Sequence, residues 1–262
     1  MHNYGTPLEL TKIGCLKASQ IIKQFLLQID HSIKSEKQQT KQSISEMLQR
    51  INKLAIETPL STRPQRFANE AIADFHTSLS VQKWMHNDVL DRYLLASFGN
   101  PCRMDYGTGH ELNFLCFLYC LVEEEIMEIN EVYETLKEYF NIIRVLILRF
   151  NLEPAGSHGQ WGIDDYQILP YVLGAAELVG TDITWDQMLK MESNGYAQAV
   201  RFAAQHRAQN NAGGYSPMVL ALKTRTWDCI NNGLIRMYES EVLDRGVVMQ
   251  HFIFSKYLPR DY

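Results

Sequence analysis

The sequence predicts an all-α protein that forms a single domain over residues 1–262. Hydrophobic residues make up 46% of the chain, and most recur at the three- and four-residue spacing of amphipathic helices. No run alternates apolar and polar residues over the length of a strand. A chain of this size buries roughly three-quarters of its unfolded surface, which is enough for a large core. We therefore expect one helical body without internal repeats.

The first part of the chain is expected to form four helices. Their predicted ranges are residues 16–29, 44–54, 67–79 and 81–95. Thr58-Pro59 is expected to end the second helix, because a proline disfavours helical geometry at the residue before it. The segment 98–101, Phe-Gly-Asn-Pro, is expected to end the fourth for the same reason, with glycine adding to the effect.

Longer helices are expected in the rest of the chain. Their predicted ranges are residues 110–129, 132–150, 166–179, 184–209 with breaks, and 227–242. The longest apolar run, residues 112–122, is interrupted by Asn113 and is shorter than the ~20 residues that span a bilayer. Cys116 and Cys120 lie four residues apart in this run, which favours small core side chains over metal ligands. Residues 210–217, rich in Asn and Gly, are expected to form a loop.

Charge and targeting signals narrow the class of protein. The net charge is −5 and there is no basic block, which argues against nucleic acid as a partner. The N-terminal residues lack the basic and apolar regions of a signal peptide, and no membrane partner is expected. The five cysteines are irregularly spaced, which does not indicate a disulfide framework. We expect a cytoplasmic or nuclear protein.

A first glycine loop, residues 99–111, has features of a phosphate site. Gly107 and Gly109 allow close backbone approach, and the amides that open the following helix favour an anion. Arg103 offers two parallel donors for a phosphate, and the Thr108 hydroxyl adds another. The alternative is structural, since Thr108 to Glu111 fits the capping box of a helix N-terminus. The loop is not a Walker motif, because the glycines are not followed by Lys and Ser or Thr at the required spacing.

A second glycine loop, residues 153–166, combines three glycines with two adjacent carboxylates and Trp161. Asp164 and Asp165 could supply oxygen ligands to Mg²⁺, which takes one or two carboxylates and keeps several waters. The alternative is that one aspartate caps the helix beginning near Tyr166 and that Trp161 packs in the core.

These two loops and their flanks resemble signature segments of the phosphotyrosyl phosphatase activator family. The first match covers Phe98-Gly99-Asn100 and residues 103–111, and the second covers residues 153–159 and 161–167. Further blocks lie at residues 66–71, 232–238 and 250–254. The resemblance runs in order from about Leu10 to Leu258, which is nearly the whole chain.

The resemblance implies core, linker and lid subdomains around a cleft. It implies an activator of the protein phosphatase 2A catalytic subunit that depends on Mg-ATP and has peptidyl-prolyl cis-trans isomerase activity. By position, the residues expected to contact ATP are Arg103, Thr108, Gly109, Val247, Val248 and Met249. Gly159 and Asp165 are expected at the magnesium ion.

The chain departs from the family pattern at four places. Ala68 stands where a glycine is usual, and Phe75 where another aromatic residue is usual. Arg245-Gly246-Val247 replaces a stretch that commonly carries proline, and Ser255 replaces a glycine. The last two departures border the segment expected to line the nucleotide.

Prolyl isomerisation needs no nucleophile, because its barrier of ~18–20 kcal/mol reflects lost amide resonance. An apolar pocket that holds proline and a donor to its nitrogen are sufficient to lower the barrier. We expect the two glycine loops to meet across the cleft and bind proline-containing peptide segments. Trp161 and Tyr106 would form its apolar wall, and Asp105 or Asp165 would orient polar contacts; these four are the candidate catalytic residues.

Two other functions can be weighed against the same residues, and the sequence favours only the first of them. The chain could be a non-enzymatic, chaperone-like protein that binds the phosphatase, holds ATP at the interface and assists loading of active-site metals. A free-standing ATPase or kinase is disfavoured, because the sequence has neither a Walker lysine nor the HRD and DFG motifs of kinases.

Overall fold

The structure, a computed structural model, describes residues 16–35, 43–63, 67–156, 162–209, 214–249 and 252–260. Within these ranges, regular structure is helical apart from two strands of two residues each, which confirms the all-α prediction. The helices in chain order are α2 (Leu16–Lys34), α3 (Ser45–Glu57), α4 (Ile72–Ser80), α5 (Asp88–Leu95), α6 (Thr108–Glu123), α7 (Val132–Phe150), α8 (Leu169–Ala176), α9 (Trp185–Met188), α10 (Gly195–Gln209), α11 (Pro217–Leu222), α12 (Trp227–Tyr238) and α13 (Gly246–Met249). A 3₁₀ turn, η1 (Ile129–Glu131), precedes α7, and a π-helical turn, η2 (Glu239–Leu243), follows α12.

Helices α6, α7 and α8 form the centre of the core. Helix α6 is apolar on nearly all sides, and a helix of that kind is stable only when other elements surround it. It packs against α7 through Phe114 and Tyr139, whose rings stack with centroids 3.8 Å apart. Cys116 and Cys120 are fully buried, which confirms their prediction as core side chains. None of the described helices is both long and apolar enough to cross a bilayer.

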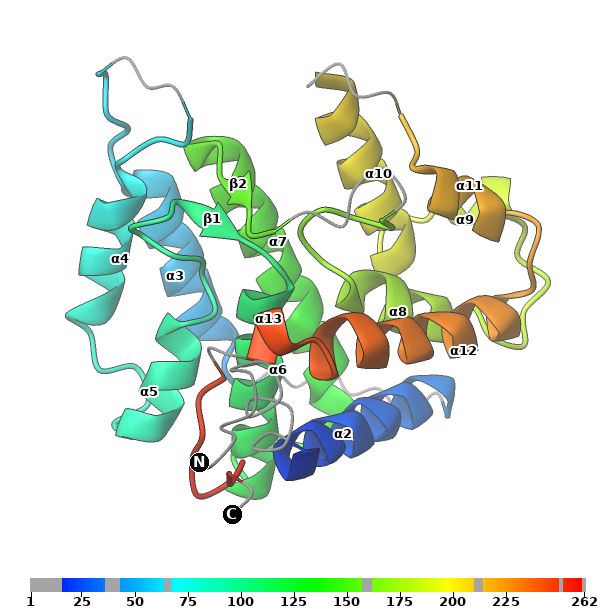
Figure 1. The fold of residues 1–262 in the computed structure, drawn as a ribbon, viewed down its shortest axis with the longest axis horizontal. Helices are drawn as coiled ribbons and strands as arrows, with labels where there is room; N and C mark the ends of the chain where they lie inside the picture. The colour runs from blue at the N-terminus through cyan, green and yellow to red at the C-terminus, as the bar shows by residue number, and fades with distance from the viewer. Residues whose placement is uncertain are drawn as a thin grey trace, which may run out of the picture.

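The amphipathic helices cover this centre on two sides (Figure 1). Helices α3, α4 and α5 lie on one side, and α9 to α12 lie on the other. Helix α2 is tied to α12 by a buried polar network: Asn231 donates to Asp30 at 2.9 Å, and Lys34 donates to Asn231 at 2.7 Å. Lys34 also pairs with Asp30 at 2.7 Å, so both charges in this network are compensated.

Helices α8 and α10 approach closely at Gly174. A Cβ atom added there would lie 1.9 Å from the backbone nitrogen of Tyr196. Only a residue without a side chain allows the two backbones to be this close. Asn194 secures the crossing, because its side chain donates to the Gly174 carbonyl at 2.8 Å and accepts from the Ala197 amide at 2.9 Å.

A buried glutamate joins α6 to the start of α8. Glu111 is fully buried, and its two carboxyl oxygens accept the backbone amides of Ile168 at 3.1 Å and Leu169 at 3.2 Å. These amides open α8 and have no partner inside that helix. Burial raises the pKa of Glu111 to about 8, so proton binding at this side chain is coupled to folding.

Several predicted helix boundaries are wrong, and at three of them a side chain or a left-handed residue accounts for the difference. The helix expected from residue 67 begins at Ile72, since the Asn69 side chain accepts the Ala71 amide at 3.1 Å and forms a turn. The helix expected from residue 81 begins at Asp88, where Asn87 caps it. Helix α6 ends at Glu123 instead of continuing to residue 129, and Glu125 has a φ of 56°.

The sequence gives no expectation of the shortest elements. These are β1 (Asp105–Tyr106), β2 (Glu153–Pro154), α11 and α13. Each is too short to show a period of hydrophobic residues. The helix expected over residues 166–179 is correspondingly shorter, because Asp164 holds the chain in a turn up to Leu169.

We expect Gly174→Ala to destabilise the protein by about 1–3 kcal/mol, because the added methyl group would force α8 and α10 apart. Gly233→Ala is the matched control. Gly233 lies within α12, and apart from the adjacent helix backbone no atom of the described residues lies within 4 Å of the added methyl group, so this variant should be more stable by up to about 1 kcal/mol. Urea unfolding followed by circular dichroism measures both changes. A Gly174→Ala variant as stable as wild type would contradict the close crossing.

The Glu111 carboxyl predicts a pH dependence of stability. Its folded pKa is raised, so the stabilisation from its bound proton is complete below pH 4.5 and is lost as pH rises through about 8. The free energy of unfolding of wild type, relative to Glu111→Gln, should therefore fall by about 1–3 kcal/mol between about pH 5 and about pH 9. Glu192→Gln, at an exposed carboxylate, should show no such trend. A constant difference between wild type and Glu111→Gln would contradict the prediction.

Candidate functional site

The first glycine loop is a tight turn that brings Arg103 next to Asp105. Gly99 has a φ of +94°, and a Cβ atom there would lie 2.7 Å from the carbonyl oxygen of Asp105, so only glycine fits. The Asn100 side chain accepts the backbone amides of Cys102 at 2.9 Å and Arg103 at 2.8 Å. The Asn100 amide in turn donates to the Asp105 carbonyl at 2.9 Å, which closes the turn.

A short parallel strand pair joins the two glycine loops. Strand β1 pairs with β2 in a register that places Asp105 opposite Glu153 and Tyr106 opposite Pro154. The Ala155 amide donates to the Tyr106 carbonyl at 2.7 Å. Gly107 lies so near Ala155 that an added Cβ would be 3.0 Å from the alanine methyl group. The expectation that the two loops meet is confirmed for the parts that the structure describes.

Helix α6 begins one residue earlier than the proposed capping box requires. Gly107 is its N-cap residue, and the His110 Nδ1 atom accepts the Gly107 amide at 3.2 Å. The predicted pairing of Thr108 with Glu111 is wrong, because this helical phase turns Glu111 into the core. Thr108 and Gly109, the first two residues of α6, line the space next to the two loops, where a helix N-terminus favours negative charge.

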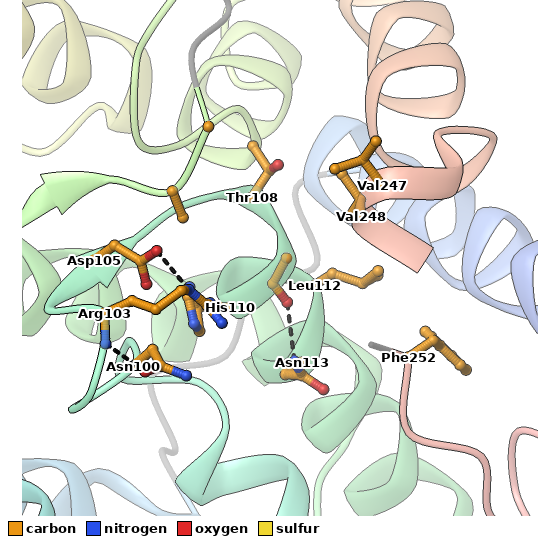
Figure 2. Close-up of a pocket in the computed structure, with 13 residues that line it drawn as sticks. Asn100, Arg103, Asp105, Thr108, His110, Leu112, Asn113, Val247, Val248 and Phe252 are labelled. Atoms are coloured by element: carbon orange, nitrogen blue, oxygen red, sulfur yellow. Dashed lines mark hydrogen bonds and ion pairs between the residues drawn. The ribbon is translucent and has the colours of Figure 1, made fainter. Parts of the chain in front are cut away.

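A cavity of about 520 Å³ lies between this helix N-terminus, the two loops and α13. Figure 2 shows Asn100, Arg103 and Asp105 on one side, and Val247, Val248 and Phe252 on the other. The lining residues are Asn100, Arg103, Asp105, Thr108, Gly109, His110, Leu112, Asn113, Ala155, Gly156, Val247, Val248 and Phe252. One half of the cavity thus offers donors for a phosphate and the other offers apolar contacts, and the volume is in the range of small-molecule sites.

Helix α13 forms the apolar wall of this cavity. Val248 packs near Gly109, where an added Cβ would lie 3.7 Å from a Val248 methyl group, and Val247 is 62% exposed at the rim. Met249, the third residue expected to line the nucleotide, points the other way: it is buried and does not line the cavity. A four-residue helix presents neighbouring residues on different sides, so Met249 packs inward while the two valines face the ligand space.

Arg103 and Asp105 form an ion pair at the polar end. The Arg103 Nε atom donates to Asp105 Oδ2 at 2.8 Å. The side chain of Arg103 is 51% exposed, whereas that of Asp105 is 12% exposed. The other carboxylate oxygen, Oδ1, is buried and has no hydrogen-bond partner among the residues that the structure describes. The carboxylate is therefore the fixed partner of the pair, and the guanidinium reaches into the cavity.

The expectation that Tyr106 forms a wall of the cleft is wrong. Its ring is fully buried, and its hydroxyl lies 2.9 Å from that of Tyr139, which donates to the Ser97 carbonyl at 2.7 Å. Successive residues of a strand point to opposite sides, so when Asp105 faces the cavity, Tyr106 must face the core. Tyr106 consequently fixes the position of β1 and is not placed to contact a ligand.

The remaining predicted residues lie away from this cavity or outside the described ranges. Asp165 does not line the cavity and pairs with Arg207 at 3.4 Å. Asp164 is buried and accepts the Tyr166 amide at 2.7 Å, but it caps no helix, because α8 begins at Leu169 with Ile168 as its N-cap residue; the capping alternative is therefore wrong for Asp164. Gly159 and Trp161 lie outside the described residues. The described part of the chain contains no group of three or more His, Cys, Asp or Glu side chains that could hold a metal.

The structure adds lining residues that the sequence did not single out as a site. Asn113 lines the cavity and donates to the Gly109 carbonyl at 3.0 Å. Asn113 interrupts the longest apolar run of the sequence. A polar residue inside an apolar helix is unusual, so its position could have indicated that this side of the helix faces a cavity. Asn100 and Phe252 also line the cavity. Both lie in segments that carry the family resemblance, but no role followed from their residue types alone.

Comparison with known proteins identifies the same family as the motifs. Residues 12–260 match the phosphotyrosyl phosphate activator (PTPA) protein family. A serine/threonine-protein phosphatase 2A activator of Encephalitozoon cuniculi is 42% identical over 237 residues, covering 90% of each chain. A serine/threonine-protein phosphatase 2A activator 2 of Saccharomyces cerevisiae is 32% identical, covering 90% of this chain and 76% of its own.

A solved structure shares the fold over almost the whole chain. It is the crystal structure of the PP2A phosphatase activator Ypa1 PTPA1, which aligns with a TM-score of 0.77 and 25% identity. The alignment covers 95% of this chain and 91% of that one. Motifs, sequence relatives and fold agree, and the chain belongs to the phosphotyrosyl phosphate activator (PTPA) family, whose relatives named here are activators of protein phosphatase 2A.

Proposed function

We propose that this protein activates the catalytic subunit of protein phosphatase 2A in a Mg-ATP-dependent manner, in the cytoplasm or nucleus. Its relatives are named as phosphatase 2A activators, which supports the activity and the partner. The observation that carries the nucleotide part is the single cavity lined by Arg103, Thr108, Gly109, Val247 and Val248. These residues come from separate parts of the chain and are the ones that the family resemblance assigns to ATP.

The cavity fits an adenine nucleotide. A polyphosphate would lie against the Arg103 guanidinium, the Thr108 hydroxyl and the first amides of α6, where the helix dipole favours negative charge. The base would lie against Val247, Val248 and Phe252, which supply apolar surface. Bound ATP would add a charged and hydrogen-bonding group between the first loop and α13.

The described residues fit a magnesium site made by protein carboxylates less well than they fit the nucleotide. Asp165 pairs with Arg207 and does not line the cavity, and the Asp105 Oδ2 atom is held by Arg103. Magnesium usually binds substrate phosphates together with one or two carboxylates and several waters. We therefore propose that Mg²⁺ enters with the phosphates of ATP, and that a direct role of Asp165 requires its release from Arg207.

The bound ATP would support binding of the phosphatase, and its hydrolysis would not be part of the function. The carboxylate in the cavity, Asp105, is engaged by a guanidinium at 2.8 Å and is not placed as a free general base. This favours the chaperone-like mode, in which ATP is held where the protein meets the phosphatase and assists metal loading there. Appreciable ATP hydrolysis by the chain alone would contradict it.

Peptidyl-prolyl cis-trans isomerase activity on proline-containing segments is the second proposal, and the family resemblance carries it. The apolar wall expected from two of its four candidate residues does not support it: Tyr106 is buried in the core, and Trp161 lies outside the described residues. Asp165 remains a candidate for orienting a peptide, with Arg207 as its neighbour in the described part of the chain. The isomerase site would then be separate from the nucleotide cavity.

Arg103→Ala should weaken binding of Mg-ATP by at least about tenfold, because it removes the guanidinium from the polar end of the cavity. Calorimetric titration of purified phosphatase 2A catalytic subunit, with and without Mg-ATP, should show nucleotide-dependent binding by wild type that the variant loses. Arg63→Ala is the matched control, since Arg63 is 82% exposed on a loop outside the cavity. Equal binding by wild type and Arg103→Ala would contradict the nucleotide assignment.

The isomerase proposal predicts that Asp165→Ala slows prolyl isomerisation by about tenfold or more, a barrier increase of about 1.4 kcal/mol. A proline-containing peptide followed by exchange NMR gives the rate directly. Asp182→Ala, at an exposed carboxylate, is the control and should keep the wild-type rate. If wild type itself does not accelerate isomerisation, the activity is absent and the activator function stands without it.

A further inference from the structure

The Arg103–Asp105 pair has one rigid and one projecting member. Asp105 is the rigid member, because it lies in β1 and its carbonyl accepts the Asn100 amide at 2.9 Å. Arg103 is the projecting member, since half of its side chain is exposed and the residue lines the cavity. The bond between them uses Nε and leaves the two terminal nitrogens of the guanidinium without a hydrogen bond in the described part of the chain.

This arrangement fixes the direction of the guanidinium. A guanidinium carries five N–H donors in a planar fork, and docking its Nε edge presents the terminal edge in one orientation. An exposed arginine would otherwise lose rotamer freedom on binding a ligand. The pairing therefore removes part of that entropy loss before the ligand arrives.

The Asp105 carboxylate is unfavourable in two respects, one for the stability of the fold and one for the binding of an anion. Within the described ranges its Oδ1 atom is buried without a partner, and an unsatisfied buried acceptor is destabilising. Its negative charge also opposes the approach of an anion to Arg103. By orienting Arg103, Asp105 should strengthen phosphate binding, whereas its negative charge should weaken it. An experiment can show which of the two effects is larger.

We propose that Asp105 is a positioning residue that docks Arg103 through Nε and aims its terminal nitrogens at the polyphosphate of a nucleotide. This inference rests on the proposed function, in which the cavity holds Mg-ATP. Asp105 contacts the arginine and not the reacting or bound group, which replaces its expected role as a catalytic residue.

The test is a double-mutant cycle on Mg-ATP affinity, measured by calorimetry on the full chain and on its complex with the phosphatase catalytic subunit. Asp105→Ala should weaken affinity by about tenfold, and Asp105→Asn, which keeps a neutral acceptor, should weaken it by less. In the Arg103→Ala background, Asp105→Ala should cause no further loss. Circular dichroism and thermal unfolding check that each variant is folded.

Each alternative gives a different pattern. Equal or tighter binding by Asp105→Ala would mean that charge opposition outweighs orientation, and it would overturn the inference while leaving the nucleotide assignment intact. An equal loss in both backgrounds would mean damage to the loop and would also overturn it. If wild type binds no Mg-ATP alone or in the complex, the nucleotide assignment is wrong and the inference fails with it.

A readout independent of nucleotide comes from the Nε–H resonance of Arg103. In wild type it should exchange slowly with solvent, and in Asp105→Ala it should exchange at the rate of a free arginine. The same exchange rate in both proteins would show that Asp105 does not hold the guanidinium, which would overturn the inference.

Discussion

The candidate site depends on the pairing of β1 with β2. Only two residues of each strand take part, yet the pairing fixes the first glycine loop against the second and sets the distance from Gly107 to Ala155. Parallel pairing joins segments that are far apart in sequence, and the long helices α6 and α7 form the connection between them. The two loops can therefore line one cavity only because those helices return the chain to the same edge.

Strand β1 has two faces, of which one is anchored in the core and the other meets the cavity. On one face, the Tyr106 hydroxyl reaches Tyr139, which in turn reaches Ser97, so the strand is anchored in the core. On the other face, Asp105 holds Arg103 at the cavity. The opposite wall is held differently, by a four-residue helix that follows a π-helical turn. One wall of the cavity is thus fixed by a strand in the core, and the other by a short helix whose Met249 is buried.

Much of the fold could be predicted from hydrophobic periodicity, and most of the site from the family motifs. Helix α7 begins and ends where its pattern predicts, because its buried residues repeat over nineteen positions. Periodicity failed at Asn87 and Asn69, where single side chains cap or turn the chain locally. It also gave no warning that Tyr106 is buried or that Met249 faces inward. Which face of a two-residue strand or a four-residue helix meets the core depends on distant segments.

The charge distribution in the cavity indicates what kind of anion it suits. Asp105 compensates Arg103, so the polar end has donors and a helix N-terminus but little net positive charge. A simple phosphate ion would gain only those contacts and would lose its hydration. In the proposed binding mode, a nucleotide would gain the same contacts together with the apolar surface of Val247, Val248 and Phe252. The proposed preference for a nucleotide over free phosphate would therefore come from the polar and the apolar half of the cavity lying in one space.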